Sequence, residues 1–137
     1  SLYAEMARAI DDRVARISEQ FVSHNDWRAN LNQMVDRRLQ AYEIIMPYRV
    51  AAEALKFQST ILLTQHMKFV RDERQRLIGL MPKTLLGDAI LTEGLEAALS
   101  FDMWNQLRND QRLGATEAGE VVKRIVSSLL AGYSGNT

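Results

Sequence analysis

The chain has 137 residues, of which 47% are hydrophobic, and its 17 basic side chains balance its 17 acidic ones. This is the length and composition of one globular domain. A domain that binds nucleic acid usually has an excess of basic residues, and the balanced charges of this chain show no such excess. The lack of cysteine excludes disulfides and thiolate chemistry. The sequence has neither a membrane-length apolar run nor a signal-peptide pattern, so we expect a cytoplasmic protein with no membrane contact.

Glycine and proline are too sparse for a protein built from β-hairpins. The first glycine is Gly79, the only prolines are Pro47 and Pro82, and no Asn-Gly or Asp-Gly turn occurs. Sheets need such turns, so the sequence predicts an all-α fold of five or six helices.

The first predicted helix runs from about Leu2 to about Phe21. Its apolar residues recur at steps of three and four: Leu2, Met6, Ala9, Ile10, Val14, Ile17 and Phe21. Ser23, with Asp26 three residues later, resembles the capping-box start of a second helix. We expect Pro47 either to kink that helix or to open a new, short one from Tyr48 to about Lys56.

A long helix is predicted next, from about Ser59 to about Leu80, ended by Gly79 and Pro82. Thr84 is the expected N-cap of another long helix that reaches about Asp110. The segment Leu113-Gly114-Ala115 breaks the chain, and Thr116 is expected to cap a last helix that ends near Leu130. The predicted domain covers residues 1–131, and residues 132–137 are expected to form a disordered tail.

The predicted Thr84–Asp110 helix is apolar over about 220° of its circumference, whereas a surface helix needs a stripe of about 100°. Together with the broad apolar face of the last helix, this predicts a dimeric four-helix bundle with two-fold symmetry. The aligned small residues Gly87, Gly94 and Ala98 fit a close contact either within the chain or between subunits. The predicted dimer interface consists of Gly87, Leu91, Gly94, Leu95, Ala98, Val122, Ile125, Val126 and Leu129.

Two polar residues interrupt apolar stripes. His66 is either a core histidine with a hydrogen-bond partner or a ligand-contacting group, with metal binding as the weakest alternative. A buried Arg38 without a partner would be costly, so it extends to solvent, pairs with a carboxylate or faces an anionic ligand. The candidate residues for an adaptable apolar ligand pocket are Met34, Arg38, Tyr42, Met46, Phe57, His66, Phe69, Phe101 and Trp104.

No catalytic constellation is present in the sequence. A di-iron bundle needs Glu-x-x-His pairs, but the residues three before His66 and His24 are Leu63 and Phe21. No phosphate-cradling loop or nucleotide fingerprint occurs. We therefore predict a protein that is not an enzyme, with no cofactor and no metal site.

Three stretches resemble the regulatory domains of TetR-family transcriptional repressors. Leu2-Tyr3-Ala4-Glu5-Met6 is similar to the segment after the family's helix-turn-helix, and the stretch from Leu91 to Arg108 resembles the family's penultimate helix. Asp110-Gln111-Arg112-Leu113-Gly114-Ala115-Thr116-Glu117-Ala118 resembles the loop before its last helix.

The resemblance implies about six helices, a homodimer formed by the last two long helices, and a small hydrophobic or amphipathic effector held inside each protomer. Effector binding would move the first helix and, through it, an N-terminal DNA-binding head that this sequence lacks. Without that head the chain is not expected to bind operator DNA. The alternative is a helical homodimeric interaction module with no small-molecule site.

Overall fold

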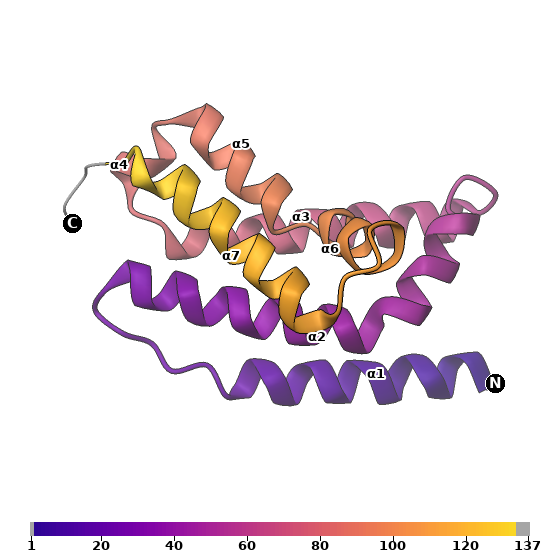
Figure 1. Cartoon of the computed structure of the whole chain (residues 1–137). Helices are drawn as coiled ribbons and strands as arrows, with labels where there is room; N and C mark the ends of the chain where they lie inside the picture. The colour runs from indigo at the N-terminus through magenta and orange to yellow at the C-terminus, as the bar shows by residue number, and fades with distance from the viewer. Residues whose placement is uncertain (1, 134–137) are drawn as a thin grey trace.

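The computed structural model describes residues 2–133, except for the side chains of residues 2–4, 6 and 7. All regular elements in this range are helices, which confirms the all-α class (Figure 1). In chain order they are α1 (Leu2–Glu19), α2 (Trp27–Leu55), α3 (Thr60–Leu80), α4 (Lys83–Leu86), α5 (Ala89–Ala98), α6 (Phe101–Asn105), the π-helical turn η1 (Gln106–Asp110) and α7 (Ala115–Ala131). Within the described range no helix is long and apolar enough to span a membrane.

The loop between α1 and α2 folds the two helices side by side (Figure 1). Side chains of α2 hold this loop: Gln33 bonds both backbone groups of Val22, and Asn30 bonds both backbone groups of His24. The N-cap of α2 is Asp26, whose Oδ1 accepts from the Arg28 amide at 3.0 Å. The predicted start at Ser23 was therefore wrong by three residues.

Helix α2 continues through Pro47 and ends only at Leu55. The separate short helix from Tyr48 to Lys56 was wrong, and the other expectation, a kink, agrees with the turn of the C-terminal part of α2 away from α1 in Figure 1. Proline removes one backbone hydrogen bond and crowds the preceding turn, so it bends a helix that packing keeps intact.

The single helix predicted for Thr84–Asp110 was wrong, because the chain forms four short pieces there. Thr84 lies inside α4, not at an N-cap. Asp88 caps α5 by accepting from the Leu91 amide, and the Ser100 hydroxyl caps α6 by accepting from the Met103 amide. Each cap begins a new helix with its own axis. The apolar residues that a single helical wheel spreads over about 220° therefore lie on separate helices and point in different directions.

The last helix begins one residue before the predicted cap. Gly114 occupies the N-cap position of α7, and Thr116 lies in its first turn. At the other end, the half-buried Tyr133 packs edge-on against Trp27, with ring centres 5.9 Å apart. Tyr133 thus belongs to the packed domain and not to the predicted tail, of which residues 134–137 lie outside the described range.

The core lies between the first two-thirds of α2 and the C-terminal half of the chain. Its largest fully buried side chains come from α2 to α7: Leu31, Tyr42, Leu77, Leu85, Leu95, Leu99, Trp104 and Val122. Glu43 ties α6 and η1 to α2, because its carboxylate accepts from the Trp104 indole at 2.8 Å and from two nitrogens of Arg108. The bonds from Arg108 are the main reason that the pKa of Glu43 is lowered.

Candidate functional site

A cleft opens between α1 and α3, with α2 as its floor. It consists of two adjoining cavities of about 490 and 500 Å³, and each is within the range of roughly 300–1,000 Å³ that suits a small-molecule ligand. Four residues line both cavities: Val14, Ala41, Glu73 and Arg76. We call this feature the α1 cleft. The cavity lined by Arg37 is its Arg37 end, and the cavity lined by Tyr48 is its Tyr48 end.

The walls of the α1 cleft are mostly apolar. The Arg37 end is lined by Val14, Phe21, Met34, Ala41 and Leu80, and the Tyr48 end by Ile10, Val14, Ala41, Tyr42, Ile45, Tyr48 and Phe69. Helix α1 forms one wall through side chains that are only half-buried. An apolar cleft with a few fixed polar groups is the usual form of a small-molecule site.

A buried ion pair crosses the Arg37 end from α2 to α3. The Nε of Arg38 lies 2.7 Å from Oε2 of Glu73, and its Nη2 donates to the Glu73 carbonyl at 2.8 Å. The Leu99 carbonyl accepts from Arg38 at 3.4 Å and from the Tyr42 hydroxyl at 2.8 Å. Burial, aided by the charge of Glu73, raises the pKa of Tyr42 far above its usual range, so this phenol stays a neutral donor. Arg38 thus pairs internally.

A second buried arginine lines the Tyr48 end. Nη2 of Arg49 donates to Glu53 at 3.2 Å and to Nδ1 of His66 at 2.8 Å, and its guanidinium lies 4.3 Å from the ring centre of Phe69. Because arginine can only donate, Nδ1 accepts and His66 is neutral. Burial first, and then the charge of Lys56, lowers the pKa of His66. His66 is therefore a hydrogen-bonded histidine next to the cleft and lines neither cavity.

The structure brings some of the predicted ligand residues together. Met34 and Arg38 line the Arg37 end, and Tyr42 and Phe69 line the Tyr48 end. Phe101 lies behind this wall, with its ring edge-on to Tyr42 and the centres 5.4 Å apart.

Three predicted ligand residues lie away from the α1 cleft. Phe57 is 83% exposed at the turn between α2 and α3. Trp104 is buried with its indole bonded to Glu43, and the sulfur of Met46 accepts from the Asn109 side chain. The reason is that these residues lie on different parts of the chain, namely α2, the turn after it and α6, so they do not share one pocket.

Of the charged residues that line the cleft, the sequence interpretation named only Arg38. It missed the others, among them Arg37, Arg49, Glu73 and Arg76. A weak signal was present for Arg49, which lies seven residues after Tyr42 and is thus on the same side of α2. The partner of Arg38 had no signal, because Glu73 is 35 residues away in the chain.

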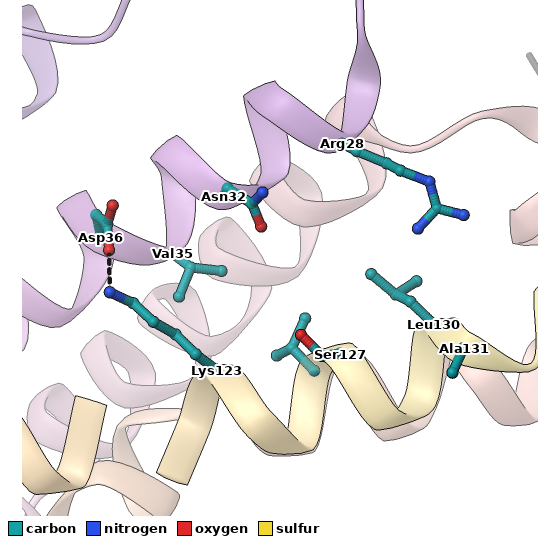
Figure 2. Close-up of a pocket in the computed structure, with 9 residues that line it drawn as sticks. Arg28, Asn32, Val35, Asp36, Lys123, Ser127, Leu130 and Ala131 are labelled. Atoms are coloured by element: carbon teal, nitrogen blue, oxygen red, sulfur yellow. Dashed lines mark ion pairs between the residues drawn. The ribbon is translucent and has the colours of Figure 1, made fainter. Parts of the chain in front are cut away.

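A further cavity, of about 490 Å³, lies between α2 and α7 (Figure 2). Lys123 reaches across it to Asp36 at 2.8 Å, and Arg28 lies at the opposite end above Leu130. We call this cavity the α2–α7 groove. Its two ion-paired side chains are about half-exposed, and its walls are more polar than those of the α1 cleft, so it is the weaker candidate for an apolar ligand.

The predicted dimer residues gather on α5 and α7, which pack against each other within the chain. Five of them are buried within the chain: Leu91, Leu95, Ala98, Val122 and Val126. A side chain added at Gly94 would meet the Leu129 methyl groups at 3.5 Å, so the contact at this glycine is within the chain. Ile125 and Leu129 are half-buried, and Gly87 is exposed in the turn after α4. The dimer itself stays a prediction.

Among the described residues, no group of three or more histidine, aspartate and glutamate side chains could hold a metal ion. Comparison with protein-family models, with curated proteins and with solved structures finds no match for this chain. The function is therefore argued from the α1 cleft and the surfaces around it.

Proposed function

We propose that this chain is the effector-binding and homodimerising domain of a TetR-like transcriptional repressor that acts in the cytoplasm. A small, mostly apolar effector would bind in the α1 cleft. Its binding would be relayed through α1 to an N-terminal DNA-binding head, and contact with DNA would occur only through that head.

The observation that carries the proposal is the α1 cleft itself. It consists of two adjoining cavities that share four lining residues, its walls are mainly apolar, and two buried arginines fix its polar groups. These properties favour binding of a small molecule over catalysis, because both arginines are engaged with carboxylates and neither is paired with a nucleophile.

Helix α1 is suited to respond to an occupant of the cleft. Among its described side chains none is fully buried, and it packs chiefly against α2. The ligand would gain contacts with Ile10 and Val14 only while α1 is docked. A ligand shifts a conformational equilibrium by its difference in affinity for the two states, so contacts of this kind would stabilise one position of α1.

For dimerisation we propose the outer face of α5 and α7. Ile90 of α5 is 87% exposed, and Val121, Ile125 and Leu129 of α7 are half-buried. The buried members of the predicted interface would support this face from inside the protomer. An isologous contact of two such faces is the usual form of a homodimer.

The effector site is tested with a neutral apolar dye, Nile red, and a panel of apolar compounds that compete with it. Ala41→Trp places a large ring in the section shared by both cavities, so it should reduce dye binding by at least about tenfold, which is 1.4 kcal/mol. Ala51→Trp is the matched control, because Ala51 is exposed on the same helix and outside the cleft. Equal dye binding by both variants and the wild type would contradict a ligand site in the cleft.

The dimer is tested by sedimentation equilibrium at tens of micromolar protein. Ile90→Glu should convert a dimer into a monomer without loss of helix content, because Ile90 contributes little to the protomer core. Leu95→Glu does not serve this purpose, since Leu95 is 0% exposed and a buried unpaired carboxylate would unfold the chain. A monomeric wild-type protein would contradict this part of the proposal.

The second candidate function is a helical interaction module without an effector site. It is favoured by exposed apolar side chains near the tip formed by α2 and α3: Leu55, Phe57, Ile61 and Met67. Its distinguishing result is a dimer that takes up neither dye nor any compound of the panel.

A further inference from the structure

The charges of the α1 cleft are distributed unevenly along its length. At the Tyr48 end three cationic side chains face three carboxylates: Arg49, Lys68 and Arg76 against Asp11, Asp72 and Glu73. At the Arg37 end three arginines face a single carboxylate: Arg37, Arg38 and Arg76 against Glu73. In a chain with no net charge, this places a local positive excess beside an apolar wall.

The carboxylate of Glu73 cannot neutralise the Arg37 end. One of its oxygens is 2.7 Å from Arg38, and the other is 3.5 Å from Arg76. Arg38 is buried and its hydrogen bonds are directed to Glu73 and to backbone carbonyls. Arg76 is two-thirds exposed, so its long contact with Glu73 leaves most of its donors free for another acceptor.

Arg37 is the least satisfied cation in the cleft. Within the described part of the chain its single hydrogen bond runs from Nη2 to the Gln20 carbonyl at 3.4 Å, and it makes no ion pair. Its Nε is buried and has no hydrogen-bond acceptor among the described residues. A guanidinium in this state is suited to a carboxylate or similar oxyanion, which it can bind through two parallel hydrogen bonds.

We propose that the α1 cleft selects an amphipathic anion, whose acid group binds to Arg37 and Arg76 and whose apolar body extends past Val14 toward the Tyr48 end. This inference rests on the proposed function of the cleft as an effector site and specifies the class of effector. A cationic or neutral compound of the same length would leave the positive excess uncompensated.

The test compares three ligands with the same apolar chain, namely decanoate, decanol and decylamine, as competitors of Nile red. For the wild-type protein we expect decanoate to bind about tenfold more tightly than decanol, and decylamine to bind most weakly. Raising the salt concentration should reduce this preference, because the acid group and Arg76 are partly exposed to screening.

Arg37→Gln combined with Arg76→Gln should bring decanoate to the affinity of decanol while the affinity for decanol stays unchanged. The matched control is Arg28→Gln combined with Lys123→Gln, which removes two positive charges from the α2–α7 groove (Figure 2) and should leave the preference intact. Circular dichroism checks folding, and the two single variants are measured separately should the double variant unfold.

The outcomes separate the two proposals. Equal binding of decanoate and decanol by the wild-type protein, or a preference that persists in the Arg37/Arg76 variant, would overturn the anion assignment and leave the effector site standing. A preference lost equally in the control would also overturn it, because the effect would then come from net charge. If none of the three compounds displaces the dye and Ala41→Trp does not affect dye binding, the effector site itself fails.

Discussion

The buried pair of Arg38 and Glu73 allows the sharpest test of how this fold is held together. Arg38→Met keeps much of the length of the side chain but removes its charge and its bonds to Glu73 and Leu99. The carboxylate of Glu73, with a side chain 16% exposed, then keeps only a contact of 3.5 Å with Arg76. The variant therefore leaves a largely buried charge without its main partner.

Breaking a buried ion pair on one side costs about 3–5 kcal/mol. The low end applies here, because Glu73 retains some exposure and a second cation, so we expect Arg38→Met to lower the free energy of unfolding by about 3 kcal/mol. Adding Glu73→Gln removes the stranded charge and should recover about 1–2 kcal/mol of this loss. The double variant is thus expected to be more stable than the single one.

The assay is urea unfolding followed by far-ultraviolet circular dichroism. With a slope of about 1.5–2 kcal/mol/M, as expected for a small domain, a loss of about 3 kcal/mol lowers the midpoint by roughly 1.5–2 M. Lys123→Met is the control, because it breaks the half-exposed pair with Asp36 and should cost less than about 1 kcal/mol. The reasoning is refuted if Arg38→Met is no worse than this control, or if the double variant is less stable than Arg38→Met.

Three further changes test single features of the fold. Tyr42→Phe removes one buried neutral hydrogen bond and should cost about 1 kcal/mol in urea unfolding, with an unchanged helix signal. Gly94→Ala should stabilise α5 by about 0.5–1 kcal/mol, because the added methyl group meets Leu129 at an ordinary contact distance and alanine favours helices. Gly79→Ala, in open space in α3, should give a similar gain. A loss of stability confined to the Gly94 variant would contradict the described packing of Gly94 against Leu129. The pKa of His66 is lower in the folded chain than its ordinary value of 6.5, so as the pH falls the unfolded state binds a proton before the folded state does. The free energy of unfolding should therefore be highest above pH 6.5 and should decrease as the pH falls from there to the folded pKa. In His66→Asn, whose amide oxygen can still accept from Arg49, the part of the pH dependence due to this histidine should vanish, and an unchanged pH profile would count against it.

The sequence was sufficient for the fold class because helical periodicity is a property of each segment by itself. The prediction failed over Thr84–Asp110, because a helical wheel shows the angle of each residue but assumes that the backbone is one continuous helix. Asp88 and Ser100 can each cap a new helix by accepting from an amide three residues later. Both signals were present in the sequence, but the strong apolar pattern around them outweighed them.

The candidate site was predicted only in part, and the reason differs from that for Thr84–Asp110. Arg38 and Tyr42 were found because they share an apolar stripe of α2, and both line the α1 cleft. Their surroundings depend on how α1 and α3 lie against α2, which no local pattern encodes. The same holds for α5 and α7: much of their wide apolar faces is buried within the chain, and a wheel cannot distinguish this from contact with a second subunit.

In the proposed mechanism the half-buried state of α1 and the existence of the cleft have one physical cause. The apolar residues of α1, such as Val14, cover a floor on α2 that also carries Arg37 and Arg38. Tight docking of α1 would bury the unpaired charge of Arg37 further, at a cost that apolar contacts of a few half-buried side chains cannot offset. An amphipathic anion supplies both missing parts, a counter-charge for Arg37 and apolar surface for Val14. Effector binding and the position of α1 would then be coupled through the same contacts, as a relay to a neighbouring domain requires.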